Sequence, residues 1–513
     1  MRYSLAIIAG ILMASSLGLA AAPKEGQQAS ALRSDGDKRA VASPRAATTG
    51  PASQPSSQPA GRPTSRPTSR PTSAAASQAT TTTASAPASQ AATQPAEPKD
   101  RYLAVVGGIM HPVSGPARRG VTILCKNGRI LEIGPHVKLP ESTQIVDASG
   151  LHVYPGLVAA QSRGIVGRAP PRETTNVFST TMSLAVAGGL TTVVTGNTAA
   201  KVTFGSLDGI ELRKDLFVKL SYRTPAQRRK VWQALEKVRA YLREKEAYER
   251  KKAEAEAKPA ADDAKKGEEE LSPPDESAVK GGNAKYLKLI RREQAALIQA
   301  DTRPQLEAVC RLARTFGIRV IVQGATEGWT IAGALGRAGI RAIVSPRRLP
   351  SRDERKNQPT GGNIENTAIL YEHGVDVAVT PAAANISLMG LAGRDLLNLP
   401  MAAAYAVRGG LPEDAALEAI TLGAARVLGV DDRVGSIEEG KDADFILCDG
   451  RLLDFFTTVQ QTIVNGRVVY EKRKEPLFAD IRPRTPTTQP ATYKFWPRRF
   501  KPRMTPQADP SRR

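Results

Sequence analysis

Histidine and cysteine are scarce in this chain of 513 residues, which contains four histidines and three cysteines. The cysteines, Cys125, Cys310 and Cys448, lie far apart in the sequence and form no CxxC pair. An odd and sparse count of this kind argues against a disulfide framework and against a cysteine-based zinc site. We therefore expect all three cysteines to be small buried hydrophobic residues rather than redox groups.

The chain also has little long apolar sequence. Residues 5–19 are apolar, but this run is shorter than the about 20 residues that a membrane span needs. Arg2 precedes the run and small residues (Ala20–Ala22) follow it, which is the pattern of an export signal over residues 1–22. We expect a periplasmic or secreted protein, and an uncleaved membrane anchor is the alternative.

Residues 23–100 consist mainly of Ala, Ser, Thr, Pro and Gln, and include three consecutive RPTS repeats. Such a segment has too little apolar surface to offset the entropy lost on ordering. The composition therefore predicts a disordered linker between the export signal and a folded region that starts near Arg101.

The formal net charge is +22, which by itself would suggest an anionic partner. Much of the excess lies in the linker and in the Pro-rich tail 476–513, where residues 482–513 carry nine Lys/Arg against one Asp. The sequence contains no phosphate loop and no nucleic-acid-binding motif, so we expect no nucleic-acid partner. The tail could contact an envelope surface or an anionic polymer, or it could simply be solvated.

The folded region changes its pattern along the chain. Short β-type runs separated by turn residues occupy both ends, whereas strands alternate with helices in the middle. The β-type runs are predicted at 102–109, 121–125, 130–133, 144–147, 445–448, 462–465 and 467–470. The first four runs predict a small antiparallel sheet, and the Asn465-Gly466 step between the last two predicts a hairpin. The buried strands of the middle are predicted at 191–195, 319–323, 341–345 and 375–380, and its helices at 305–316, 330–338 and 412–424.

A charged segment at 226–285 interrupts this order. Residues 226–257 are rich in Ala, Glu, Lys and Arg and predict a long solvent-facing helix, followed by a charged stretch and a second helix at 286–293. The segment could be a lid, a partner-binding arm or a solvated insertion.

Several motifs carry a resemblance to a known family. They occur in the order ILEIG at 130–134, VDASGLHVYPGL at 146–157, AGGLTTV at 187–193 and VGSIEEGKDAD at 434–444. Over residues 101–472 the sequence resembles the amidohydrolase superfamily, and its nearest branch is the imidazolonepropionase-like one.

The resemblance implies an α/β fold, with a (β/α)8 barrel and a small β-sandwich composed of both ends of the folded region. It assigns 101–155 and 435–475 to the sandwich, and 156–434 to the barrel with its insertion at 226–285. The active site of such a barrel lies at the carboxyl ends of the strands. Members of the family normally hold a divalent metal such as zinc there, which activates a water molecule.

The metal ligands that the resemblance implies are absent from the matching positions. The family has His-x-His after the first strand, a histidine after each of two middle strands and an aspartate after the last strand. This chain has Gln161 and Arg163 at the first position, Gln299 and Gln323 at the next two, and the sequence following Pro381 at the last. Because glutamine offers only a neutral carbonyl oxygen, we expect no bound metal and no other cofactor.

None of the remaining histidines is expected to replace these ligands, because none follows a strand of the predicted barrel. They are His111, His136, His152 and His373.

Glutamine keeps the length and hydrogen-bonding capacity of a polar side chain, so the pocket can stay folded and polar. The residues expected to line it are Gln161, Arg163, Gln299, Gln323 and Thr380.

Arg163 places a fixed positive charge where the family has a metal ion. The pocket is therefore predicted to bind a small anionic ligand, such as a carboxylate. In the alternative interpretation, Arg163 pairs internally with Asp301 or Glu327.

Three functions remain open, and the family class alone, a hydrolase of non-peptide carbon–nitrogen bonds, does not decide whether this chain is an enzyme. The first is a non-catalytic binding or scaffold protein. The second is a hydrolase without metal, in which Asp301 or Glu327 is the general base and Arg163 stabilises the oxyanion. The third is an inactive subunit that assembles with an intact homologue, or with copies of itself.

Overall fold

The computed structural model describes residues 100–474, except for 169, 257–271, 356, 358 and 388–394. The chain divides into a unit Met1–Ala91 and a unit Ala92–Arg513, and every described residue belongs to the second unit. The expected export signal, nearly all of the linker and the basic tail lie outside the described residues. Within the described part of the chain, no helix is long and apolar enough to cross a membrane.

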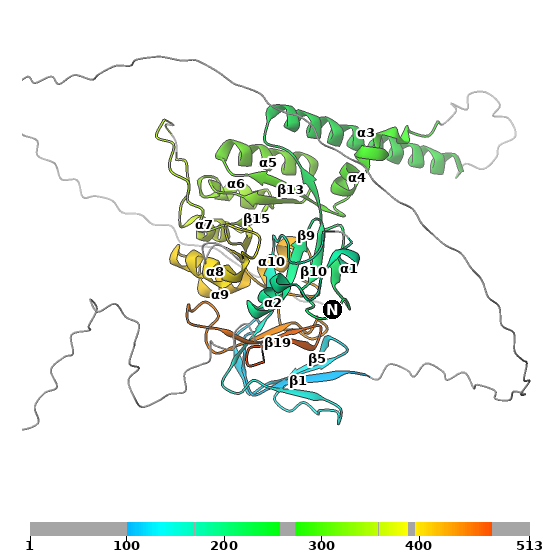
Figure 1. Ribbon diagram of the computed structural model, residues 1–513. Helices are drawn as coiled ribbons and strands as arrows, with labels where there is room; N and C mark the ends of the chain where they lie inside the picture. The colour runs from blue at the N-terminus through cyan, green and yellow to red at the C-terminus, as the bar shows by residue number, and fades with distance from the viewer. Residues whose placement is uncertain are drawn as a thin grey trace, which may run out of the picture. The chain divides into compact units, whose positions relative to one another are not determined.

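Strands from both ends of the folded region form one six-stranded sheet (Figure 1). In sheet order its strands are β19 (Arg467–Glu471), β18 (Val459–Val464), β17 (Phe445–Cys448), β7 (His152–Pro155), β2 (Ile109–Met110) and β3 (Arg118–Arg119). The predicted C-terminal hairpin is confirmed, since β18 and β19 are antiparallel neighbours. The connecting Asn465 and Gly466 have φ angles of 50° and 63°, as a two-residue Asn-Gly turn requires.

A second, four-stranded sheet uses only N-terminal residues. Its order is β5 (Arg129–Gly134), β4 (Thr122–Lys126), β1 (Tyr102–Val106) and β6 (Gln144–Asp147). The interpretation as a purely antiparallel sheet is wrong for β6, which runs parallel to β1 because the chain after β5 crosses to the far edge of the sheet. Leu103 and Ile123 of this sheet share one buried hydrophobic cluster with Phe445 and Ile463 of the six-stranded sheet.

Parallel strands form the middle of the folded region. One sheet contains β8 (Leu157–Ala159) and β9 (Leu190–Thr195), extended by β10 (Thr198–Lys201) and β11 (Glu211–Arg213). A five-stranded parallel sheet contains β12 (Phe217–Leu220), β13 (Ala295–Ala300), β14 (Val320–Gly324), β15 (Arg341–Val344) and β16 (Asp376–Val379). Most of their residues are buried, as expected for parallel strands covered by helices.

Hydrogen bonds continue the strand array from one parallel sheet to the other. The Val379 N–H donates to Ala419 O (2.9 Å) and the Val158 N–H donates to Ile420 O (2.9 Å). Residues 419 and 420 therefore lie between β16 and β8. This arrangement is of the TIM-barrel type, with the carboxyl ends of the parallel strands on one side.

Helices follow most of the parallel strands, as the alternating pattern predicts. The α-helices are α1 (Pro171–Thr174), α2 (Thr180–Ala187), α5 (Arg303–Phe316), α6 (Ala332–Arg337), α7 (Asn366–Glu372), α8 (Leu399–Arg408), α9 (Glu413–Glu418) and α10 (Leu422–Leu428). The 3-10 turns are η1 (Glu276–Ala278), η2 (Gly281–Asn283), η3 (Gly328–Thr330) and η4 (Leu396–Asn398). Gly317, with φ of 65°, ends α5 in the left-handed conformation.

The single helix predicted at 412–424 is wrong, because the chain breaks there into α9 and α10. Thr421 lies between them with φ of −133° and ψ of −101°. The carbonyl groups of Ala419 and Ile420 accept hydrogen bonds from β16 and β8, so they are not available to a continuing helix.

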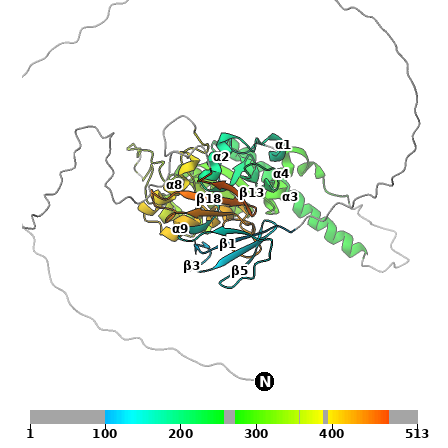
Figure 2. The ribbon, with the colours of Figure 1, turned by 60° about the horizontal axis from the view of Figure 1, so that its bottom comes forward.

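The charged insertion begins with the long helix α3 (Pro225–Glu256), and α4 (Ala284–Ile290) follows it. The prediction that this helix faces solvent along its length is wrong for its first half. Val231, Leu235 and Val238 are buried and belong to the main hydrophobic cluster, because their spacing places them on one helical face. The later part of α3 extends away from the rest of the described residues (Figure 2).

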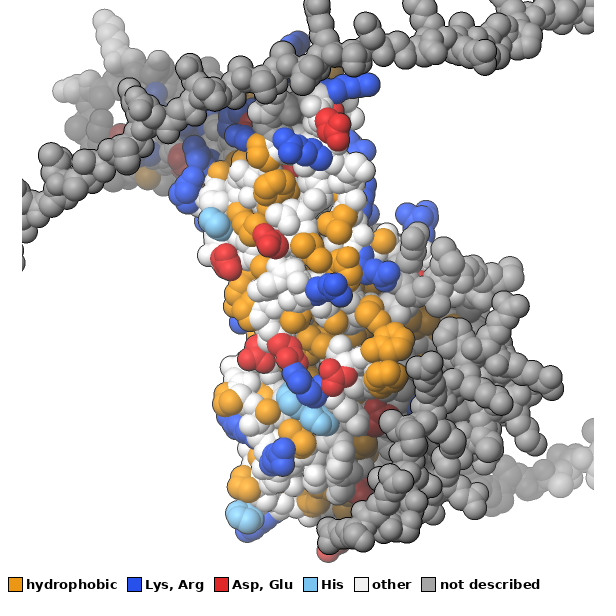
Figure 3. Space-filling view, turned by 90° about the vertical axis from the view of Figure 1, so that its left-hand side faces the viewer, with side chains coloured by type: hydrophobic (Ala, Val, Ile, Leu, Met, Phe, Trp, Pro, Cys, Tyr) orange, Lys and Arg blue, Asp and Glu red, His pale blue; other side chains and the backbone are white. Residues whose placement is uncertain are grey.

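The surface of the described region mixes side chains of different kinds. On the face shown in Figure 3, acidic and basic side chains are interspersed among apolar and neutral ones. All three cysteines are free and buried, as predicted. Burial raises the pKa of the Cys125 thiol to about 12, so this group stays protonated at neutral pH.

Candidate functional site

Three glutamines converge on one cavity at the carboxyl ends of the parallel strands. Gln161 follows β8, Gln299 lies near the end of β13, and Gln323 lies near the end of β14. Gln299 and Gln323 are direct neighbours in the strand register. All three line a cavity of about 120 Å³, so the structure brings these predicted residues together.

The rest of the cavity wall is mostly polar. Its further lining residues are Gly324, Thr326, Ile343, Ser345, Pro346, Arg348, Asn363, Asn366, Pro381 and Ala382. Inside it, Gln323 Nε2 donates a hydrogen bond to Gln161 Oε1 (3.0 Å). The Gln299 amide has no hydrogen-bond partner among the described residues, so it remains available to a ligand.

Arg163 lies outside the lining of this cavity. Its side chain is exposed, and its backbone N–H donates to Ala384 O (2.6 Å). Among the described residues it forms no ion pair with Asp301 or Glu327. The cationic side chain in the cavity wall is instead Arg348, from the loop after β15, which sequence reasoning missed because no family motif marks that loop.

Glu327 supports the loops behind the cavity. Its carboxylate is buried, and its two oxygens accept hydrogen bonds from the backbone N–H groups of Arg303 (2.8 Å) and Gly361 (2.9 Å). Both bonds hold the carboxylate in place at the start of α5. Glu327 is therefore a structural acceptor here, whereas the sequence also allowed a general base.

Asp301 lies closer to the cavity wall. Thr326 Oγ1 donates a hydrogen bond to Asp301 Oδ1 (2.7 Å), and the guanidinium groups of Arg348 and Arg223 each lie 3.9 Å from the carboxylate. Gly324, with φ of 110°, allows this approach, because a Cβ there would lie 2.3 Å from Asp301 Oδ1. Asp301 thus orients the rim residue Thr326.

Thr380 marks the end of β16, where the family resemblance places the metal-binding aspartate. Its N–H donates to Val344 O (2.9 Å), and its buried hydroxyl oxygen has no hydrogen-bond partner among the described residues. Its chain neighbour Pro381 lines the cavity, while Thr380 itself is not part of the wall. The predicted pocket is therefore made of the three glutamines without Arg163 and Thr380.

The donor set at the strand ends does not fit the divalent metal that the family resemblance implies. Zinc and its relatives prefer imidazole, thiolate and carboxylate donors, whereas the three side chains here are neutral amides. One amide oxygen, on Gln161, already accepts a hydrogen bond from Gln323. Among the described residues, no group of three or more His, Cys, Asp or Glu side chains could hold a metal ion.

Two of the histidines form a pair that the sequence did not reveal. His111 Nε2 lies 2.9 Å from His152 Nδ1, and both rings stack near Tyr154 in the six-stranded sheet. Burial, and then the neighbouring His152, lower the pKa of His111 to about 4. The pair therefore consists of neutral rings at neutral pH and belongs to the β-rich region rather than to the strand-end cavity.

Comparison with known proteins agrees with this geometry. Residues 305–469 match the model of the amidohydrolase family. The chain is 43% identical over 63 residues to N-acetylglucosamine-6-phosphate deacetylase of Danio rerio, which covers 12% of this chain and 14% of that protein. It is 28% identical over 116 residues to imidazolonepropionase of Thermoplasma volcanium, which covers 21% of this chain and 26% of that protein. These alignments span only a minor part of each relative.

A solved structure extends the similarity to most of the folded region. The crystal structure of an amidohydrolase from Thermotoga maritima MSB8 aligns with a TM-score of 0.54 and 21% sequence identity, covering 72% of this chain and 100% of that one. The structural match concerns the fold, which is of the TIM-barrel type. The amidohydrolase family model matches residues 305–469, and the structural likeness extends the shared fold to most of the folded region.

Proposed function

We propose that this chain is an amidohydrolase-fold protein, of the imidazolonepropionase-like branch, that binds a small polar ligand and does not hydrolyse it. In this proposal the parallel strands close into a (β/α)8 barrel, and the β-sandwich from both ends of the folded region supports it. The observation that carries the proposal is the convergence of Gln161, Gln299 and Gln323 on one cavity where the family resemblance places metal ligands.

The chemistry of the cavity suggests the kind of ligand. Its wall offers amide and hydroxyl groups, and Arg348 supplies the cationic side chain. Gln299 can donate and accept hydrogen bonds, whereas Arg348 can only donate. A small molecule with one carboxylate and further polar atoms fits this donor set, so the anionic ligand predicted from Arg163 is now assigned to Arg348.

The environment of the carboxylates favours binding over catalysis. A general base must reach the proton that it removes, but both oxygens of Glu327 accept backbone hydrogen bonds. Asp301 accepts a hydrogen bond from Thr326 and lies 3.9 Å from each of two guanidinium groups, so its carboxylate is already engaged by neighbouring side chains.

We infer that the protein works outside the cytoplasm. The N-terminal sequence pattern supports export, and the composition of 23–100 supports a linker that holds the folded region away from its site of attachment or release. The basic tail is proposed to contact an acidic envelope surface or polymer. In the alternative proposal, the chain is an inactive subunit that assembles with an intact homologue, and the cavity then has a structural role.

The first test is the metal content of the purified full chain. The protein is incubated with zinc, manganese or iron, desalted and measured by plasma mass spectrometry, beside a variant with Gln161, Gln299 and Gln323 all changed to Ala. We expect background metal in both proteins. About one metal ion per wild-type chain, lost in the triple variant, would overturn the proposal and restore a metal-dependent hydrolase.

The second test concerns the ligand. Small mono- and dicarboxylates are screened by thermal unfolding of the wild type, Arg348→Gln and, as a matched control, Arg163→Gln. A ligand at 100 times its Kd adds about 2.7 kcal/mol to the free energy of unfolding. We expect this stabilisation in the wild type and in Arg163→Gln, and its loss in Arg348→Gln. Loss in Arg163→Gln alone would return the binding role to Arg163.

A further inference from the structure

A second cavity, of about 270 Å³, lies away from the strand-end cavity, where the N-terminal strands meet the chain after β10 and the C-terminal hairpin. Four arginines from distant parts of the sequence line it, namely Arg101, Arg129, Arg433 and Arg467. Only two carboxylate side chains, Asp208 and Asp442, belong to the same wall. The cavity is therefore surrounded by more positive than negative charge.

The carboxylates are already engaged by cations of the wall. Arg433 Nη2 contacts both oxygens of Asp442 (3.1 and 2.8 Å), and Arg467 Nη1 lies 3.2 Å from Asp208 Oδ2. Arg101 Nη2 donates only to a backbone carbonyl, Asn465 O (3.1 Å). The Arg129 guanidinium forms no hydrogen bond or ion pair among the described residues. Two of the four arginines thus lack an acidic partner.

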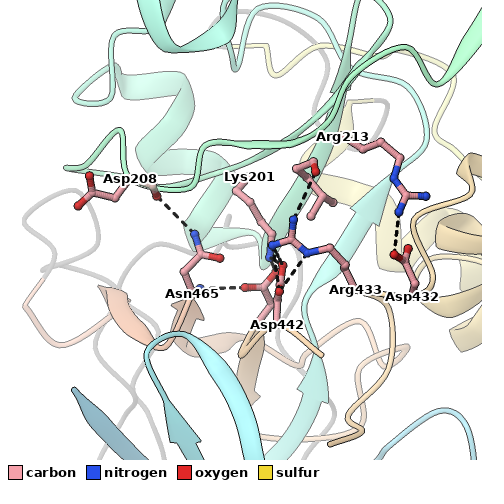
Figure 4. Close-up of polar contacts among 9 residues, drawn as sticks. Lys201, Asp208, Arg213, Asp432, Arg433, Asp442 and Asn465 are labelled. Carbon is pink, nitrogen blue, oxygen red and sulfur yellow. Dashed lines mark hydrogen bonds and ion pairs between the residues drawn. The ribbon is translucent and has the colours of Figure 1, made fainter. Parts of the chain in front are cut away.

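Beneath the wall, Lys201 of β10 adds a further positive charge. Its ammonium group is fully buried and contacts Asp444 and, at 2.8 Å, Asp442 (Figure 4). Asp442 is therefore shared between Lys201 and Arg433. Lys201 and the four arginines thus make five cationic side chains in and below the wall, against the three carboxylates of Asp208, Asp442 and Asp444.

Two of the arginines, Arg101 and Arg467, repel each other in this arrangement. Burial, and then the charge of Arg467, lower the pKa of Arg101. A guanidinium has donors and no acceptor, so a neighbouring arginine cannot relieve it. An anion placed between the arginines would remove this repulsion.

Two hairpin turns hold the wall in place. Gly128, with φ of 86°, packs so closely on the C-terminal hairpin that a Cβ there would lie 2.8 Å from Asn465 O. Asn127 Oδ1 accepts a hydrogen bond from the Arg101 N–H (2.9 Å), and Gly466 N–H donates to Ala443 O (2.9 Å). The backbone positions of Arg101 and Arg129 are thereby fixed before any ligand binds.

We propose that this arginine-lined cavity is a binding site for a small multivalent anion of the phosphate class. The fork of a guanidinium matches the oxygens of a phosphoryl group, which can accept from several arginines at once. The site is separate from the amide cavity, and its occupancy does not depend on the ligand proposed there.

The test compares two charge-removing variants of the full chain. Arg129→Gln removes the unpaired guanidinium of the cavity. Arg213→Gln is the matched control, because Arg213 pairs with Asp432 at the surface and does not line the cavity (Figure 4). Binding of inorganic phosphate, pyrophosphate and glycerol phosphate is measured by calorimetry, with sodium chloride used to keep the ionic strength constant.

We expect phosphate-class anions to bind the wild type and Arg213→Gln equally, and to bind Arg129→Gln about tenfold more weakly, as the loss of one charge-assisted hydrogen bond implies. Preference for pyrophosphate or glycerol phosphate would distinguish a larger phosphorylated ligand from the free anion. Absence of binding beyond that of chloride, or equal weakening in both variants, would overturn the proposal. The Arg129 guanidinium forms no hydrogen bond or ion pair among the described residues, so we expect Arg129→Gln to fold like the wild type. Thermal unfolding without phosphate checks this.

Discussion

The two cavities of this protein hold their polar side chains in different ways. At the strand ends, three glutamine amides meet in a polar wall that also contains the cationic Arg348, and Gln323 donates a hydrogen bond to Gln161. In the arginine-lined cavity, charged groups dominate, and the carboxylates of Asp208 and Asp442 in the wall compensate only part of the positive charge. An amide can both donate and accept, whereas a guanidinium can only donate.

The two cavities therefore differ in their electrostatic cost without a ligand and in the kind of ligand that each can bind. In the amide cavity, Gln161 and Gln323 pair with each other at little electrostatic cost without a ligand, and Gln299 remains available. The arginine-lined cavity contains like charges, so it gains more from an external acceptor. Removal of single groups should therefore change stability most around Lys201 and least around the glutamines.

The largest effect is expected for Lys201→Met. Removing the buried ammonium leaves Asp442 and Asp444 without it, and breaking a buried ion pair from one side costs about 3–5 kcal/mol of the free energy of unfolding. Denaturant unfolding measures this loss. The control is Lys219→Met, at an exposed position of β12, where we expect a change within about 0.5 kcal/mol. Similar losses in both variants would show that the network contributes little.

A smaller loss is expected for Glu327→Ala, beside the amide cavity. The change leaves the backbone N–H groups of Arg303 and Gly361 without their acceptor, which costs about 1.5–3 kcal/mol for hydrogen bonds to a charged group. Glu307→Ala is the control, because Glu307 is a half-exposed residue of α5 whose carboxylate contacts the Arg303 side chain (2.9 Å) and no backbone N–H among the described residues. A hydrolytic activity that disappears in Glu327→Ala while the unfolding free energy stays unchanged would instead identify a general base.

The histidine pair extends the comparison to pH. The folded pKa of His111 is about 4, below its ordinary value of 6.5, so the folded state binds fewer protons than the unfolded state between these values. The contribution of His111 to the free energy of unfolding is therefore present above pH 6.5 and is lost as the pH falls toward 4. Allowing for partial solvent screening, we expect a loss of about 1–2 kcal/mol over this window.

Denaturant unfolding at pH 7 and at pH 4.5 measures this dependence in the wild type, in His111→Asn and in the control His136→Asn, whose histidine is exposed. The pH-dependent loss should shrink in His111→Asn and persist in His136→Asn. A slope that is the same in all three proteins would assign the acid sensitivity to other groups.

The smallest effect is expected within the amide pair. A double-mutant cycle of Gln161→Leu and Gln323→Leu should give a coupling energy of about 0.5–1 kcal/mol, the net value of one neutral hydrogen bond. A coupling energy of zero would mean that the two amides are solvated separately. In that case both would be as available to a ligand as Gln299 is.

Much of the fold was readable from the sequence because it depends on local patterns. The Asn465-Gly466 hairpin, the strands that end near Gln299 and Gln323, and the helix that follows Thr302 each have a signature within a few residues. The break near Thr421 was missed because the carbonyls of Ala419 and Ile420 bond to β16 and β8, which are distant in the sequence.

The candidate site was predicted in part for the same reason. The three glutamines follow strands, so their meeting at one end of the strand array follows from parallel topology. The sequence could not decide which of Arg163 and Arg348 lines the cavity, since each lies in a loop whose direction no local pattern determines. Glu327 could not be assigned either, because its acceptor role depends on Gly361, 34 residues away.

By itself, the sequence determined the order of strands and helices, the scarcity of metal-ligating side chains and the glutamines at strand ends, because these are properties of residue type and spacing. The tertiary structure alone decided which charges meet. Arg101, Arg129, Arg433 and Arg467 are separated by up to 366 positions in the sequence, yet they line one cavity above Lys201. Electrostatic interactions act through space, so only the folded chain shows where charges add and where they cancel.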